Sequence, residues 1–112
     1  MKVKHITLGM YLTLTDTGPI IEKQNKKIGI HKYVRWIMRV AKKDTLGVYC
    51  YQYNPRTNHL SINREFSETK TYETFFINDY ILAKLKSIRK ATKKEIKLFK
   101  ENAEPILVID KL

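Results

Sequence analysis

Three tyrosines recur at every second position in the stretch VYCYQYNPR, which runs from Val48 to Arg56. If this stretch is a β-strand, Tyr49, Tyr51 and Tyr53 project from the same face, because successive side chains of a strand point to opposite sides. Basic residues lie close by in the sequence, and the candidates are Arg35, Arg39, Lys42, Lys43 and Arg56. Proteins that bind single-stranded nucleic acid stack aromatic rings on bases, at about 1–3 kcal/mol per base, and place cations on phosphates. These tyrosines and basic residues therefore form the candidate site for nucleic acid or another partner.

The exposure of the tyrosines depends on how their strand pairs with residues 31–43. This segment fits both a helical and a strand pattern, and its aromatic and β-branched residues favour a strand that forms a hairpin with the tyrosine strand. A four-residue loop places Val40 opposite Tyr51 and buries the tyrosines at least partly. A loop of three or five residues moves them to the face of Arg39, where they form an open platform. Gly47 suits a three-residue loop, but four-residue loops are also common, so both registers stay open, with packing favoured over a platform.

Other chemistry has little support in the sequence. His5, His31 and His59 are scattered singly, and Cys50 has no partner at the spacing of a metal site. The single cysteine excludes an intramolecular disulfide, and we expect it to be a buried thiol. The sequence contains no glycine-rich phosphate loop and no convincing acid–base pair. We therefore expect no metal, no cofactor and no enzymatic activity.

The chain is strongly basic, with 22 Lys and Arg against 11 Asp and Glu and a net charge of +11. Such an excess attracts polyanions. Lysines outnumber arginines by 17 to 5, which weakens the case for base-specific reading. The length of 112 residues suits one domain, 1–112. We see no signal peptide, and no apolar stretch approaches the roughly 20 residues that cross a bilayer, so we expect a cytoplasmic protein that does not enter the membrane.

The pattern along the chain predicts a sheet followed by one helix. The expected strands cover residues 6–14, 31–43, 48–53, 59–66, about 80–88 and 106–110. Gly9 predicts a bend in the first strand, and the polar residues 22–27 predict an exposed loop or hairpin tip. The helix is expected over about 93–103, because Thr92 and Glu95 have the spacing of a capping box.

Two stretches carry a resemblance to a known group of proteins. HITLGMYLTL near the start and IRKATKKEIKLF near the end cover about a fifth of the chain. They resemble the small SH3-like β-barrel proteins encoded by bacteriophages and integrated elements, with their I-x-x-G-M opening strand and A-T-x-x-E-I helix start. The resemblance implies a small non-enzymatic accessory protein and assigns no residue a role. The expected fold is thus α+β, a small mostly antiparallel curled sheet or SH3-like barrel with one C-terminal helix.

The function expected from the sequence is a small non-enzymatic nucleic-acid-binding protein of phage or mobile-element origin. The alternative is a phage-encoded inhibitor of a host defence nuclease, similar to an anti-CRISPR protein, which acts by binding protein. Small size and a surface rich in Tyr and Arg suit such an interface, since these residues are enriched at binding hot spots. DNA, RNA or a nucleic-acid-handling host protein all remain open as partners, as does the oligomeric state.

Overall fold

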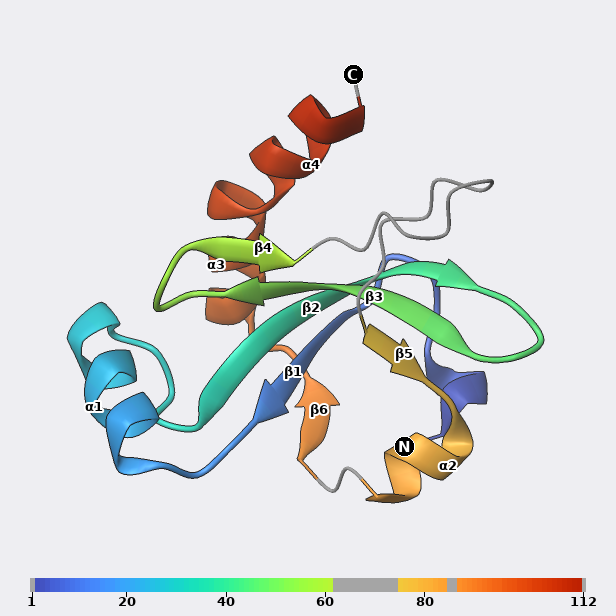
Figure 1. The fold of residues 1–112 in the computed structure, drawn as a ribbon, viewed down its shortest axis with the longest axis horizontal. Helices are drawn as coiled ribbons and strands as arrows, with labels where there is room; N and C mark the ends of the chain where they lie inside the picture. Colours follow the sequence, from blue (N-terminus) through green and yellow to red (C-terminus); the bar gives the residue numbers. More distant parts are fainter. Residues whose placement is uncertain (1, 62–74, 85–86, 112) are drawn as a thin grey trace.

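The computed structural model describes residues 2–61, 75–84 and 87–111. Within them, six strands form one curled antiparallel sheet in the order β4-β3-β2-β1-β6, and β5 pairs with β3 beside β4 (Figure 1). The strands are β1 (Tyr11–Thr15), β2 (Val34–Lys43), β3 (Val48–Asn54), β4 (His59–Ser61), β5 (Phe75–Ile77) and β6 (Ile88–Lys90). The helical elements are η1 (Val3–His5), α1 (Pro19–Ile28), α2 (Asp79–Lys84), α3 (Lys93–Asn102) and α4 (Glu104–Lys111). This confirms the α+β class and the antiparallel sheet, and the sheet formed by the described residues does not close into a barrel.

The hairpin and the capped helix agree with the sequence analysis. Residues 31–43 contribute the strand β2, whose partner β3 carries the tyrosines. Helix α3 starts with the predicted capping box: Thr92 Oγ1 accepts a hydrogen bond from the Glu95 N–H, and Glu95 Oε1 accepts one from the Thr92 N–H. Of the predicted return strand 59–66, the structure has a strand at His59–Ser61, and the remainder lies outside the described residues.

Helix α1 occupies residues 22–27, where the sequence analysis wrongly expected an exposed loop. Pro19 stands in its first turn, where a fixed φ and a missing N–H are tolerated. Gly29 ends it in the left-handed conformation at φ 73°, and its N–H donates to the carbonyls of Asn25 and Lys26. The helix was missed because its buried residue is the polar Asn25, so the apolar periodicity that marks most surface helices is weak.

Two other predicted strands are also helical. The segment predicted as a strand over about 80–88 holds helix α2, and the strand β6 begins only at Ile88. Residues 106–110, predicted as a final strand, belong to helix α4. There the buried Leu107 joins the same apolar cluster as Ala103, so tertiary packing overrides the strand preference of the β-branched neighbours.

The first predicted strand is shorter than expected. A short 3₁₀ helix, η1, and a turn precede it, and β1 begins only at Tyr11. Gly9 makes the predicted bend, with φ 81°, in the turn before the strand. The apolar alternation continued through this turn because Ile6 is buried against the sheet although it lies outside the strand.

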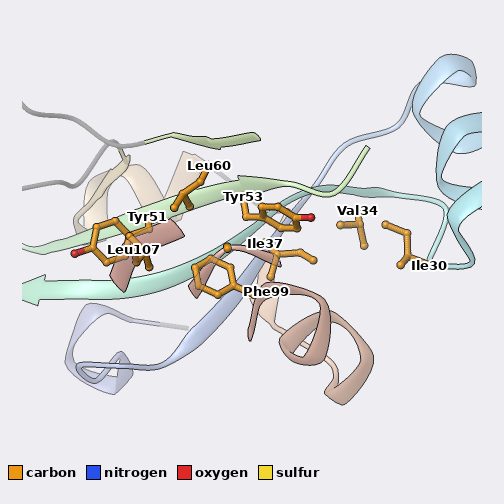
Figure 2. Packing of buried hydrophobic residues seen from close by; sticks show 9 residues of the cluster. Ile30, Val34, Ile37, Tyr51, Tyr53, Leu60, Phe99 and Leu107 are labelled. Carbon is orange, nitrogen blue, oxygen red and sulfur yellow. The ribbon is translucent and has the colours of Figure 1, made fainter. Parts of the chain in front are cut away.

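Both faces of the sheet are buried. The helix-side core packs β2 and β3 against α3 and α4 (Figure 2), and its buried residues are Ile30, Val34, Ile37, Tyr51, Tyr53, Leu60, Phe99, Ala103 and Leu107. The inner core lies on the opposite face, enclosed by the curl of the sheet, and its buried residues are Ile6, Leu12, Met38, Val40, Val48, Cys50 and Ile77. Cys50 is buried, as predicted. The two cores therefore cover both faces of the described sheet.

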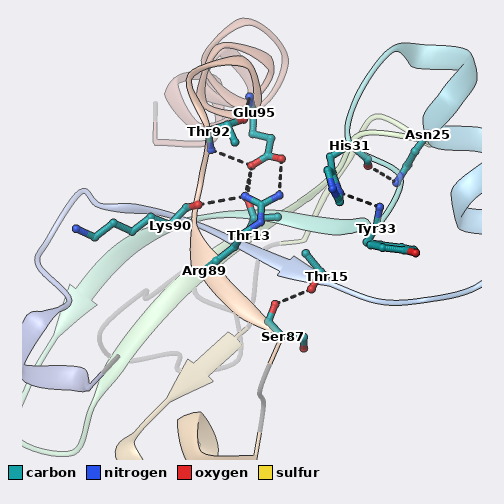
Figure 3. Close-up of polar contacts among 10 residues, drawn as sticks. All are labelled: Thr13, Thr15, Asn25, His31, Tyr33, Ser87, Arg89, Lys90, Thr92 and Glu95. Atoms are coloured by element: carbon teal, nitrogen blue, oxygen red, sulfur yellow. Dashed lines mark hydrogen bonds and ion pairs between the residues drawn. The ribbon is translucent and has the colours of Figure 1, made fainter.

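A buried carboxylate fixes α3 to the sheet (Figure 3). Glu95 is 2% exposed and accepts hydrogen bonds from Thr13 Oγ1 of β1 and from both terminal nitrogens of Arg89 of β6, each at 2.8 Å. Burial by itself raises the pKa of Glu95, but the hydrogen bonds from Arg89, the Thr92 N–H and Thr13 outweigh it and lower the pKa to about 2. One side chain thus joins β1, β6 and the start of α3.

Replacing Glu95 by Gln should lower the free energy of unfolding by about 3 kcal/mol near neutral pH, because each pKa unit corresponds to about 1.4 kcal/mol. The folded-state pKa of about 2 lies below the ordinary value of 4.5, so this stabilisation is present above that value and is lost as the pH falls toward 2. Urea denaturation of both proteins across this pH range measures it. The difference between wild type and Glu95→Gln should shrink in acid.

The matched control is Glu101→Gln on the same helix. Glu101 is exposed and its Oε1 lies 3.8 Å from Lys97 Nζ, so its loss should cost less than about 0.5 kcal/mol. Equal losses in the two variants would contradict an anchoring role for Glu95.

Candidate nucleic-acid interface

The loop that joins β2 to β3 has four residues, 44–47, because Lys43 pairs with Val48. Asp44 Oδ1 accepts hydrogen bonds from the N–H groups of Leu46 and Gly47, at 2.9 and 3.2 Å. A Cβ on Gly47 would lie 2.3 Å from the Ile77 carbonyl oxygen. The glycine is therefore required by the close approach of β5.

A β-bulge then changes the register of the hairpin. Ala41 has no partner in β3, so Lys42 pairs with Tyr49 while Val40 pairs with Cys50. The sequence analysis placed Val40 opposite Tyr51 for a loop of this length, and the extra residue shifts that pairing by one. Relative to the tyrosines of β3, the β2 side chains before the bulge therefore lie on the other face of the sheet from the one expected for a regular four-residue hairpin.

The bulge places Tyr51 opposite Arg39 and Tyr53 opposite Ile37. This is the face expected to be open, but α3 and α4 cover it: Tyr51 is 6% exposed and Tyr53 is 2% exposed (Figure 2). The two rings pack in the helix-side core and form no open platform. Tyr49, near the start of β3, is half-buried.

The outer parts of the tyrosines are also engaged within the protein. The Tyr53 hydroxyl donates to Asn58 Oδ1 at 2.7 Å. The Tyr49 ring lies 5.0 Å from the Phe76 ring between centroids, and Lys42 Nζ lies 5.1 Å from the Tyr49 centroid. This arrangement is typical of tyrosines that pack across strands.

The basic residues predicted to contact phosphate each have a partner in the fold. Three form ion pairs, with nitrogen–oxygen distances of 2.6 Å for Arg35–Asp16, 3.7 Å for Arg39–Glu104 and 3.9 Å for Lys42–Asp44. Lys43 Nζ donates to the carbonyl oxygens of Val3 and Ile6, at 3.2 and 2.8 Å, and so holds the N-terminal segment. The structure gives these predicted binding residues structural contacts of their own.

Arg56 is the most fully engaged of them. Its guanidinium donates to Asn25 Oδ1 at 3.2 Å, to the Val34 carbonyl at 2.6 Å and to the Arg35 carbonyl at 2.9 Å. The buried Asn25 in turn donates to the carbonyls at the start of β2, among them Val34 at 2.8 Å. Burial, and then the neighbouring Arg35, lower the pKa of Arg56. Arg56 therefore ties the β3–β4 turn, α1 and the start of β2 together.

Six exposed lysines have no such partner. They form the lysine surface, which consists of Lys23, Lys26 and Lys27 of α1, Lys32 of the turn before β2, and Lys93 and Lys94 of α3. Within the described part of the chain, no carboxylate oxygen lies within 4.0 Å of their ammonium nitrogens. The side chain of Lys94 reaches the end of α1, since its Nζ lies 3.5 Å from the position that a Cβ on Gly29 would take.

This surface was not predicted from the sequence, because residues 22–27 were expected to form an exposed loop and the lysines of residues 93–103 were given no role. The positions are up to 71 residues apart, from Lys23 to Lys94, and only the packing of both helices on the sheet joins them. The available signal was the excess of lysine over arginine.

Comparisons of the chain with protein families, with curated proteins and with solved structures found no match. Among the residues that the structure describes, no helix is long and apolar enough to cross a membrane. The same residues include no group of three His, Cys, Asp or Glu side chains that could hold a metal ion. Charge and shape are therefore the features of the molecule that bear on its function.

Replacing Arg56 by Lys should destabilise the fold by about 1–3 kcal/mol, because lysine keeps the charge but cannot supply two nitrogens in a fixed plane. The control is Arg35→Lys, which alters an exposed ion pair with Asp16 and should cost less than about 1 kcal/mol. Urea denaturation measures both. If Arg56→Lys were as stable as Arg35→Lys, the bracing role would be wrong.

Proposed function

We propose that this protein binds nucleic acid without catalysing a reaction, and that the lysine surface makes the contacts to phosphate. The proposal is supported by one observation above all. The six exposed lysines have no carboxylate partner in the described structure, and Lys94 of α3 reaches the end of α1. Several described carboxylates are already paired with other cations, namely Asp16, Asp44, Glu95, Glu101 and Glu104. These five carboxylates therefore do not neutralise the lysine surface.

The chemistry of lysine indicates the mode of binding. A lysine ammonium is a compact charge on a flexible stem, suited to phosphates whose positions vary and poorly suited to reading base edges. Binding driven by such contacts releases counterions and is largely independent of sequence. The burial of Tyr51 and Tyr53 removes them from this proposal, so stacking on those rings is not part of it.

The fold is compatible with the origin inferred from the sequence. With β6 beside β1 and β5 beside β3, the two sides of the sheet curve around the inner core. We infer an opened form of the small SH3-like barrel, elaborated by α1 and by the C-terminal helices. The phage and mobile-element accessory proteins that the sequence resembles are expected to have such a barrel.

Neutralising three residues of the lysine surface should weaken nucleic-acid binding and flatten its salt dependence. The variant is Lys27→Gln, Lys93→Gln and Lys94→Gln. For duplex DNA each phosphate contact adds about 0.9 to the slope of log K against log salt, so the slope should fall by about 2–3. Fluorescence anisotropy with labelled duplex and single-stranded oligonucleotides, over a range of salt, measures the slope.

The control variant removes the same charge elsewhere: Lys2→Gln, Lys4→Gln and Lys84→Gln, near η1 and on α2 at the other end of the molecule (Figure 1). Its slope should stay close to that of the wild type. Equal weakening in both variants would show that net charge alone, and no particular surface, drives binding. Absence of binding at low salt would refute the proposed function and direct the search to protein partners.

A further inference from the structure

The turn between α1 and β2 carries two aromatic side chains beside the lysine surface. His31 and Lys32 are exposed, and Tyr33 is half-buried. The ring centroids of His31 and Tyr33 lie 5.5 Å apart with 63° between the ring planes, an edge-to-face arrangement. Lys32 Nζ lies 4.7 Å from the Tyr33 centroid, so a member of the lysine surface contacts this aromatic pair directly.

The backbone of this turn is fixed by a buried side chain. Asn25 of α1 is fully buried. Its Nδ2 donates to the carbonyl oxygens of His31, Lys32 and Val34, at 3.2, 3.1 and 2.8 Å. Figure 3 shows the Asn25 amide beside the two aromatic residues. The segment that carries both rings is therefore held in place before any ligand binds, which lowers the entropic cost of binding there.

A local hydrogen bond also orients the His31 ring. Its Nδ1 accepts a hydrogen bond from the Tyr33 N–H at 3.2 Å (Figure 3). In the neutral imidazole the hydrogen therefore lies on Nε2, on the other side of the ring. His31 thus offers solvent an oriented aromatic side chain, whereas the rings of Tyr51 and Tyr53 are buried in the helix-side core.

An exposed ring among cations matches the chemistry of a single strand of nucleic acid. Unpaired bases stack on aromatic side chains, histidine included, whereas the bases of a duplex are paired and stacked on one another. The lysines supply contacts to the phosphates of such a strand. A surface of lysines alone has no means of preferring a single strand, because a duplex carries the denser charge. The His31 ring supplies that means.

We propose that the lysine surface takes single-stranded nucleic acid, with one unpaired base stacked on the His31 ring and neighbouring phosphates on Lys32 and the lysines of α1. Tyr33 supports the imidazole through its edge-to-face contact. Lys32 is exposed and flexible, so its ammonium can move from the Tyr33 ring to a phosphate. This inference rests on the proposed function and names its substrate class.

The test uses two variants that separate the His31 ring from its hydrogen bond. His31→Asn removes the ring but keeps an acceptor for the N–H two residues on, a contact typical of asparagine in turns. His31→Phe keeps an aromatic ring and loses the acceptor. In fluorescence anisotropy with a labelled single strand, His31→Asn should bind at least about fivefold more weakly, and His31→Phe within about twofold of wild type. The reverse order of the two variants would overturn the proposal.

The choice of ligands and a control variant make the test specific. A duplex of the same sequence, and a single strand of the same length built from abasic nucleotides, offer phosphates without a free base. Wild type and His31→Asn should therefore bind each of these equally. His5→Asn, the same change at an exposed position of η1 at the other end of the molecule, should leave every affinity unchanged (Figure 1). An equal loss in His31→Asn for all three ligands would contradict base stacking.

Salt dependence separates this inference from the proposed function. Stacking neutralises no phosphate, so His31→Asn should weaken single-strand binding at every salt concentration without changing the slope of log K against log salt. The triple variant Lys27→Gln, Lys93→Gln and Lys94→Gln should instead flatten that slope. Salt-dependent binding that His31→Asn leaves unchanged would overturn the inference and leave the proposed function standing. Absence of oligonucleotide binding at low salt would overturn both.

Discussion

The unpaired Ala41 determines which face each side chain of the central hairpin occupies. Beyond the loop, Lys43 and Val48 pair as in a regular hairpin, and Lys43 reaches the N-terminal carbonyls. The bulge then shifts the register by one residue, so that Cys50 pairs with Val40. The side chains of both residues lie in the inner core, and the side chain of Tyr51 lies under the helices. The rings of Tyr51 and Tyr53 therefore lie on the face that the helices cover, and Val40 and Cys50 lie in the inner core.

Two buried polar groups connect the helices to this sheet. Glu95 joins α3 to β1 and β6 through Thr13 and Arg89, and Asn25 joins α1 to the start of β2 with the help of Arg56. Each group has several hydrogen-bond partners, which offsets the cost of burying it. Directional bonds of this kind define how a helix is oriented, whereas apolar contacts alone tolerate sliding. The lysine surface exists because both helices are held in this way.

Signals within a few residues were readable from the sequence, and contacts between distant segments were not. Thr92 and Glu95 predicted the start of α3, because a capping box is a local signal that spans only four residues. Helix α1 was missed because its buried side chain is Asn25, whose partners belong to the next strand. The bulge was missed because alanine carries no signal for one, and the face of Tyr51 depended on it. The role of Arg56 was hidden because its acceptors include backbone carbonyls of β2, which composition does not reveal.

The division between arginine and lysine follows from the same geometry. Arg56 and Arg89 meet fixed acceptors, where a planar fork gives several aligned hydrogen bonds from one side chain. The lysines of α1 and α3 face solvent, where a mobile charge can follow a polyanion whose phosphates have no fixed place. Arg39 belongs to neither group, because it has an arginine's fork and, among the described residues, no acceptor within hydrogen-bonding distance. Its ionic contact with Glu104, at 3.7 Å, is weak and partly exposed, so solvent satisfies the remaining donors of the guanidinium.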